Sequence, residues 1–336
     1  MDLDIDDVIN EFYTYNSIKP DDYISDSKLA KINRKDIDKF IGKDVFKLNI
    51  KNWINSFEEK EKIYFLKLLS KYKYVDCREY QYILCDLVDT LDEYLKIKGY
   101  NLSQVVFVTV ESNVKSGGDN IRAVLQVSNM NKINKNQIIA AISKIENEEI
   151  DNAKVIVFID DIIGTGITTY TNIKKVCERF ECVNIKDKEL LVACLYARKK
   201  AIKHVEKSCK KIGINVSVIY YNKLNQCFEN DYIFSSKEME YAKNVICKYE
   251  KRINEDPKVK DKDYYLGFSK SKLLITFTYE TPNNTLCSFW KYSNQSAPLF
   301  PRQSQERPSI DQLKKKKAIS FNNAYEAGKV IKNENA

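Results

Sequence analysis

Short apolar runs rich in β-branched residues recur through the middle of the chain, at residues 105–110, 155–159, 190–196 and 216–221. Each run has the length and composition of a buried strand. Helices are expected between them, over residues 137–150, 169–180 and 199–211, and a further strand over residues 121–127. This alternation predicts an α/β fold with a doubly wound, mostly parallel sheet.

Residues 53–98 show helical spacing, with two apolar sets that repeat every three or four positions. These sets predict helices that build or cover a core. A surface exposed for a partner protein is the alternative. Further along, a helix is expected over residues 237–251 and a strand over residues 273–278.

The segment after that last strand, YETPNNTLCSFW at residues 279–290, combines Asn and Thr with a closing Phe-Trp pair. The side chains of Asn283 and Asn284 can hydrogen-bond to base edges, and Trp290 can stack on a base. The segment is therefore a candidate region for a base or another acceptor. A rigid turn packed against the sheet edge explains the same pattern.

Composition excludes several classes of protein. One histidine, His204, rules out a multi-histidine metal site, and the nine cysteines contain no C-x-x-C pair. The first residues are acidic, and no apolar run approaches the roughly 20 residues that a membrane span needs. We therefore expect a cytoplasmic protein with reduced thiols and no membrane partner. The net charge of +8 permits an anionic partner without requiring one.

The central stretch, KVIVFIDDIIGTGITTYTNIKKVCERF at residues 154–180, predicts a strand, an acidic pair, a tight loop and a helix. Asp160 and Asp161 end the strand, where open α/β sheets bind ligands. Their carboxylates suit sugar hydroxyls or a hydrated Mg²⁺. Backbone N–H groups at the helix start, with threonine hydroxyls, would hold a phosphate monoester, and the loop residues are Gly164, Thr165, Gly166, Ile167, Thr168 and Thr169.

One phosphate beside vicinal hydroxyls describes a ribose 5-phosphate. Neither G-x-x-x-x-G-K nor G-x-G-x-x-G is present here, so the loop is neither a Walker A loop nor a dinucleotide fingerprint. A capped strand–helix unit without a ligand is the structural alternative. A second candidate phosphate loop follows the strand at residues 105–110, with an ordinary hairpin turn as its alternative, and contains Lys115, Ser116, Gly117 and Gly118.

The central stretch resembles the fingerprint of type I phosphoribosyltransferases: an apolar strand, two acidic residues, two apolar residues and T-G-x-T. The resemblance implies that Asp160 and Asp161 contact the ribose hydroxyls of phosphoribosyl pyrophosphate and, through water, Mg²⁺. It assigns the 5-phosphate to residues 164–169 and the pyrophosphate to residues 115–118. It also implies a hood over residues 222–301 and a hood loop at residues 129–136, with Arg122, Lys132 and Lys135 in reach of the pyrophosphate.

Over residues 50–302 the chain is similar to phosphoribosyltransferase-like domains of bacterial conflict systems. The Thr-Pro-Asn-Asn-Thr-Leu pattern at residues 281–286 carries this resemblance, with Cys287 where the family pattern has a second proline. The resemblance implies an anti-phage role and, as partners, an ATPase subunit or a retron reverse transcriptase with its noncoding RNA or DNA. It divides the chain into a helical N-terminal extension (1–100), the α/β domain with its hood (101–302) and a basic tail (303–336).

Three functions remain open from the sequence. In the first, the chain is an enzyme that acts at ribose C1, with a base, a nucleic acid or a protein as acceptor. Alternatively, it senses a ribose phosphate without turnover, or it is a scaffold subunit. The basic helix at residues 199–211 and the tail are each expected to be solvated, with contact to nucleic acid as the alternative.

Overall fold

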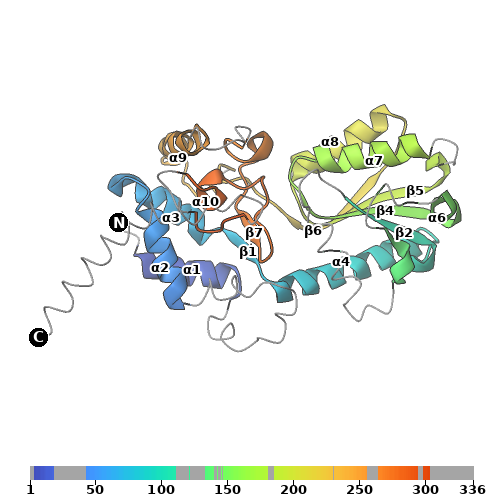
Figure 1. Cartoon of the computed structure of the whole chain (residues 1–336), viewed down its shortest axis with the longest axis horizontal. Helices are drawn as coiled ribbons and strands as arrows, with labels where there is room; N and C mark the ends of the chain where they lie inside the picture. The colour runs from blue at the N-terminus through green and yellow to red at the C-terminus, as the bar shows by residue number, and fades with distance from the viewer. Residues whose placement is uncertain are drawn as a thin grey trace, which may run out of the picture. The chain divides into compact units, whose positions relative to one another are not determined.

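Five parallel strands form the main sheet, in the order β3-β2-β4-β5-β6 (Figure 1). Their bounds are β2 Val105–Thr109, β3 Ile138–Ile139, β4 Val155–Ile163, β5 Glu189–Ala197 and β6 Ser217–Lys223. The computed structural model describes residues 4–18, 43–110, 121, 133–139, 142, 145, 147–180, 185–229, 231–255, 264–293 and 298–302. The sheet confirms the predicted doubly wound α/β class.

Helices cover both faces of this sheet. Helices α7 and α8 lie on one face and α4 on the other (Figure 1). The strands bury alternate residues toward the two layers: Phe107 and Val157 face the α4 cluster, whereas Val108 and Phe158 belong to the cluster with α7 and α8. Apolar runs without polar positions therefore form strands buried on both faces.

The helix bounds agree with several predictions. Residues 199–211 form α8 as expected, and the helices predicted at 169–180 and 237–251 are present with shifted ends as α7 and α9. Within the described part of the chain, no helix is long and apolar enough to cross a membrane. The helix bounds are α1 Ile5–Tyr15, α2 Lys43–Ile54, α3 Lys62–Ser70, α4 Cys77–Ile97, α6 Asn147–Asn152, α7 Ile167–Arg179, α8 Lys199–Lys211, α9 Met239–Asn254 and α10 Cys287–Trp290.

The helix predicted over residues 137–150 is wrong at its start. Ile138 and Ile139 form β3 and pair with Phe107 and Val108, and the helix α6 begins only at Asn147. Ile138 and Ile139 are buried in opposite layers, which a strand allows and a helix does not. The strand predicted at residues 121–127 lies outside the described residues except for Ile121, which is helical.

A second, two-stranded parallel sheet joins segments that are far apart in the sequence. Strand β1 (Lys73–Val75) pairs with β7 (Ile275–Phe277). The helical prediction for residues 53–98 is therefore wrong at β1, because Tyr74 and Val75 are strand formers placed between the end of α3 and Asp76, the N-cap of α4.

The N-terminal helices share one core with the C-terminal part of residues 1–301. The indole of Trp53 on α2 donates to the carbonyl of Ser288 at 2.8 Å and lies 4.9 Å from the Phe289 ring, between centroids. The ring of Tyr72 lies 4.7 Å from that of Phe300. Residues predicted as an extension and as a hood thus pack together. The division at residues 100 and 302 stays a prediction.

Candidate functional site

The acidic pair lies toward the carboxyl end of strand β4, just after the residues of β4 that pair with β2. Asp160 lies in register with Cys194 of β5 and accepts a hydrogen bond from the backbone N–H of Asp161 at 3.0 Å. The two aspartates are only 7% and 5% exposed, respectively. The sheet places them at the carboxyl edge of its parallel strands, where α/β folds bind ligands.

Tyr279, which follows β7, covers Asp161. Its phenol donates a hydrogen bond to the Asp161 carboxylate. Its ring stacks on Phe277 with 5.3 Å between centroids and meets the edge of Tyr80 from α4 at 5.4 Å. Burial, followed by the charge of Asp161, raises the pKa of Tyr279 well above its usual value, so the phenol stays a protonated donor.

Burial disfavours the charged form of both carboxylates. Burial, followed by the charge of Asp161, raises the pKa of Asp160 well above its usual range. Burial also raises the pKa of Asp161, although the hydrogen bond from Tyr279 opposes this shift. Among the described residues, no lysine or arginine forms an ion pair with either aspartate. A bound cation would relieve this uncompensated charge.

The acidic pair fits a hydrated Mg²⁺ better than a directly caged metal. No group of three or more His, Cys, Asp or Glu side chains in the described segments could hold a metal ion. Two adjacent carboxylates can still bind Mg²⁺ that keeps most of its water ligands. The donor set therefore agrees with the water-mediated contact predicted from the sequence.

The predicted 5-phosphate loop connects β4 to α7 and is shaped by Gly166. Gly166 is the N-cap of α7 with φ of 79°, in the left-handed region. A Cβ atom at this position would lie 2.7 Å from the carbonyl oxygen of Ala201 on α8. The residue must be glycine for this close approach. The loop therefore connects the acidic pair on β4 to the N-terminus of a thirteen-residue helix, whose first N–H groups have no partner within the helix.

Neighbouring side chains fix the rest of this loop. The Thr165 hydroxyl accepts from the backbone N–H of Ile167 at 3.3 Å, and the guanidinium of Arg198 donates to the carbonyl of Gly164 at 3.2 Å. Thr169 is buried and Thr168 is half-buried, whereas Ile167 is 43% exposed. Burial lowers the pKa of Arg198, which stays a cation next to the loop.

The segment at residues 279–290 meets the loop through Asn284. A Cβ atom added at Gly164 would lie 2.4 Å from the Asn284 side chain, so the two residues are in direct contact. The Asn284 amide donates to the Ser271 hydroxyl at 3.2 Å. Asn283 is half-buried, and its carbonyl accepts from the N–H of Phe268 at 2.8 Å. Asn284 thus contacts the predicted phosphate loop, whereas the contact of Asn283 is with Phe268.

Trp290 is placed differently from the sequence prediction. Its side chain is 1% exposed, and its indole donates to the carbonyl of Thr285 at 2.8 Å. The Tyr264 ring packs edge-on against it at 5.5 Å. A ring enclosed in this way is a core residue, so the geometry gives no support to base stacking by Trp290.

Some predicted site residues cannot be compared with the structure, and two residues of the site were not predicted. Lys115, Ser116, Gly117 and Gly118 lie outside the described residues, as does most of the candidate hood loop at 129–136. Tyr279 and Tyr80 contribute to the site and were missed by the sequence analysis. The available signal was that Tyr279 directly precedes the Thr-Pro-Asn-Asn pattern, in a segment already singled out.

Comparison with known proteins identifies the family of the chain. No curated protein matches the chain. Among solved structures, it is similar to the Helicobacter pylori xanthine-guanine-hypoxanthine phosphoribosyltransferase, at 12% identity and a TM-score of 0.27, over 44% of this chain and 84% of that one. The PRTase-CE family matches residues 50–302, which include the acidic pair, the loop and Asn284. The chain therefore belongs to the PRTase-CE family.

Proposed function

We propose that the protein is a phosphoribosyltransferase that binds phosphoribosyl pyrophosphate with Mg²⁺ and acts at ribose C1. The observation that carries this proposal is the pair of buried carboxylates, Asp160 and Asp161, directly before a glycine-shaped helix N-terminus and without an ion-pair partner among the described residues. A ribose 5-phosphate presents two hydroxyls and a phosphate at matching positions. Family membership and the parallel sheet support the same chemistry.

The residues would act by position and charge. Asp160 and Asp161 would accept hydrogen bonds from the ribose hydroxyls, and residues 164–169 would donate backbone N–H groups to the 5-phosphate. Mg²⁺, held through water by the aspartates, would neutralise charge on the departing pyrophosphate. Leaving-group departure through a transition state like an oxocarbenium ion needs orientation rather than a protein nucleophile.

The experiment is isothermal titration of the protein with phosphoribosyl pyrophosphate and Mg²⁺. The double variant Asp160→Asn/Asp161→Asn should lose binding, while Glu178→Gln, which removes one exposed charge from the far end of α7, should bind like the wild type. Pyrophosphate release with candidate acceptors then measures turnover. Equal binding by the double variant and the wild type would disprove the site assignment.

A non-catalytic sensor is the second candidate function. The hydrogen bond from Tyr279 to Asp161 favours it, because the acidic pair is already occupied by a protein group. A sensor would bind the ligand with a change at Tyr279 and release no pyrophosphate with any acceptor. A scaffold subunit would tolerate loss of both aspartates in every assay.

We further propose that the protein serves a bacterial anti-phage system as an effector, together with an ATPase subunit or a reverse transcriptase–RNA complex. The resemblance to conflict-system domains supports this role. Plaque assays on cells that carry the locus, with wild-type chain or the double Asn variant, test it. Protection that survives in the variant would exclude the ribose site from defence.

A further inference from the structure

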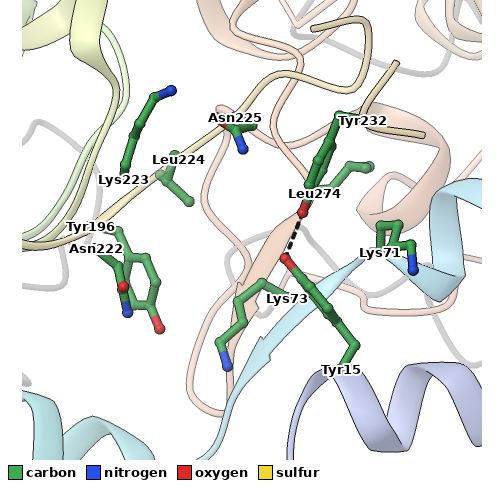
Figure 2. A pocket seen from close by; sticks show the side chains of 10 residues that line it. All are labelled: Tyr15, Lys71, Lys73, Tyr196, Asn222, Lys223, Leu224, Asn225, Tyr232 and Leu274. Carbon is green, nitrogen blue, oxygen red and sulfur yellow. Dashed lines mark hydrogen bonds between the residues drawn. The ribbon is translucent and has the colours of Figure 1, made fainter. Parts of the chain in front are cut away.

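A second concave site lies at the carboxyl ends of β5 and β6, away from the loop of α7. It is a cavity of about 240 Å³. Several elements line it (Figure 2). Tyr196 comes from β5, Asn222 and Asn225 from the end of β6 and the residues after it, Tyr15 from α1 and Lys73 from β1. Neither the acidic pair nor the phosphate loop contributes to its lining.

The lining is rich in positive charge and hydrogen-bond donors. It contains Lys71, Lys73 and Lys223 and no Asp or Glu. Lys73 forms an ion pair with Glu79 at 2.6 Å, which neutralises its charge. In the part of the chain that is described, Lys71 and Lys223 have no carboxylate partner. In Figure 2 their amino groups lie on opposite sides of the lining and point away from its middle. Their flexible stems allow both to turn toward a bound anion.

Tyrosine hydroxyls complete the wall. Tyr15 and Tyr232 share a hydrogen bond of 2.6 Å between their hydroxyl oxygens, drawn as a dashed line in Figure 2. The Tyr196 hydroxyl donates to Glu79 at 3.2 Å. Burial raises the pKa of Tyr15 and of Tyr196, so these groups stay neutral and add no negative charge. The wall therefore offers aromatic faces and hydroxyls next to ammonium groups.

The cavity lies at the same edge of the sheet as the acidic pair. Ile162 of β4, Tyr196 of β5 and Asn222 of β6 are in register. Successive ring contacts connect the two sites. The Tyr196 ring lies 6.0 Å from that of Phe277, and the Phe277 ring lies 5.3 Å from that of Tyr279, which contacts Asp161. The cavity and the acidic pair are therefore at one edge of the sheet, with the packed rings of Phe277 and Tyr279 between them.

We propose that this cavity binds the phosphate ester of a second, nucleotide-like ligand, the acceptor side of the reaction. The inference rests on the proposed function and deepens it. A phosphate would gain charge-assisted hydrogen bonds from the ammonium groups of Lys71 and Lys223, and an uncharged free base would not. The amides of Asn222 and Asn225 can hydrogen-bond to a base, and the tyrosines can stack on it. The phosphate comes from a mononucleotide or from the end of a single-stranded nucleic acid.

Titrations in the Asp160→Asn/Asp161→Asn background, which disables the proposed ribose site, test the proposal with three probes: nucleoside 5′-monophosphates, the corresponding nucleosides, and a short single-stranded oligonucleotide. The variant Lys71→Gln/Lys223→Gln should weaken phosphate-ester binding about tenfold or more, because charge-assisted hydrogen bonds are lost. Lys207→Gln/Lys210→Gln removes two exposed charges from α8 and should bind like the wild type. Nucleosides should bind weakly to all forms, and salt should weaken oligonucleotide binding less steeply in the cavity variant.

The outcomes separate the possible ligands and the two proposals. Binding of monophosphates identifies a small acceptor, and binding of the oligonucleotide alone identifies a nucleic acid end. Equal affinity of nucleosides and monophosphates, or wild-type affinity in the cavity variant, would overturn the phosphate site. Asp160→Asn/Asp161→Asn should keep cavity binding while losing phosphoribosyl pyrophosphate, so failure at one site is distinguished from failure at the other.

Discussion

The acidic pair and the glycine loop are adjacent in sequence, yet different parts of the chain hold them. The loop takes its shape from its own backbone, from Gly166 packed on α8 and from the start of α7. Asp161 instead meets Tyr279, a residue 118 positions further along. The phosphate half of the site therefore depends mainly on the main sheet and its helices, with one contact from Asn284 to Gly164, whereas Asp161 in the sugar half is held by Tyr279.

This difference affects ligand binding. The start of α7 offers backbone N–H groups to a phosphate, and the bond from the Ile167 N–H to Thr165 is a local one of 3.3 Å. The Asp161 carboxylate already accepts a hydrogen bond from a phenol, which occupies the type of position that a ribose hydroxyl needs. We expect the loop to be insensitive to changes at Tyr279, and the acidic pair to be sensitive to them.

The largest effect is expected at the loop, for Gly166→Ala. A left-handed φ costs an alanine about 1–2 kcal/mol, and the new Cβ would lie 2.7 Å from a backbone oxygen of Ala201, which adds about 1–3 kcal/mol of overpacking. Urea denaturation should show a stability loss of roughly 2–5 kcal/mol.

Gly213→Ala is the matched control for Gly166→Ala. Gly213 also has a left-handed φ, of 76°, but nothing lies within 4 Å of an added Cβ. Its loss should stay near the conformational cost alone, about 1–2 kcal/mol. Equal losses in the two variants would show that the contact between the loop and α8 does not constrain Gly166.

The next effect concerns the sugar half, for Tyr279→Phe. Removing the phenol leaves Asp161 free to accept from a ribose hydroxyl, and a hydrogen bond to a charged group contributes about 1.5–3 kcal/mol. Titration with phosphoribosyl pyrophosphate and Mg²⁺ should therefore show binding about tenfold tighter. Tyr241→Phe, on an exposed tyrosine of α9, should leave the affinity unchanged.

Weaker binding by Tyr279→Phe would reverse this interpretation. The phenol would then contact the ligand itself, and the comparison between a ready loop and an occupied acidic pair would fail. Thermal unfolding of the variant distinguishes this result from a packing defect, since Phe keeps the ring contacts with Phe277 and Tyr80.

The same difference between local and distant contacts decides what the sequence could predict. Strand β4, the loop and α7 were predictable because apolar run, acidic pair, glycines and helix follow one another within one segment. Strand β7 lies within the strand predicted at residues 273–278, whereas the three-residue strand β1 was missed. The two strands pair across about two hundred positions, and no local periodicity marks that pairing. Tyr279 was missed for this reason, since only tertiary pairing brings it to Asp161.

Side-chain burial is a further limit on sequence analysis. Asn284 and Trp290 belong to the same polar-aromatic segment, and both were predicted to face a base. The structure brings Asn284 against Gly164 and encloses Trp290 in the core. Composition cannot separate two such residues, because the direction of each depends on the chain that packs around the segment. The roles of residues 115–118 stay predictions.

The smallest effect is a change in the pH dependence of stability, for Asp160→Asn. Burial and the charge of Asp161 raise the pKa of Asp160 in the folded protein, so the folded state binds more protons than the unfolded state above about pH 4. Wild-type stability should fall as the pH rises through this window. An Asn carries no charge and its Oδ1 can still accept from the N–H of Asp161.

The stability of Asp160→Asn relative to wild type should therefore be lowest near pH 4 and should increase toward neutral pH. Urea denaturation between these pH values measures it. A variant less stable than wild type at neutral pH would mean that a counter-charge already compensates Asp160. A more stable variant that no longer binds phosphoribosyl pyrophosphate would show that the charge of Asp160 destabilises the folded protein and that its role is to bind the ligand.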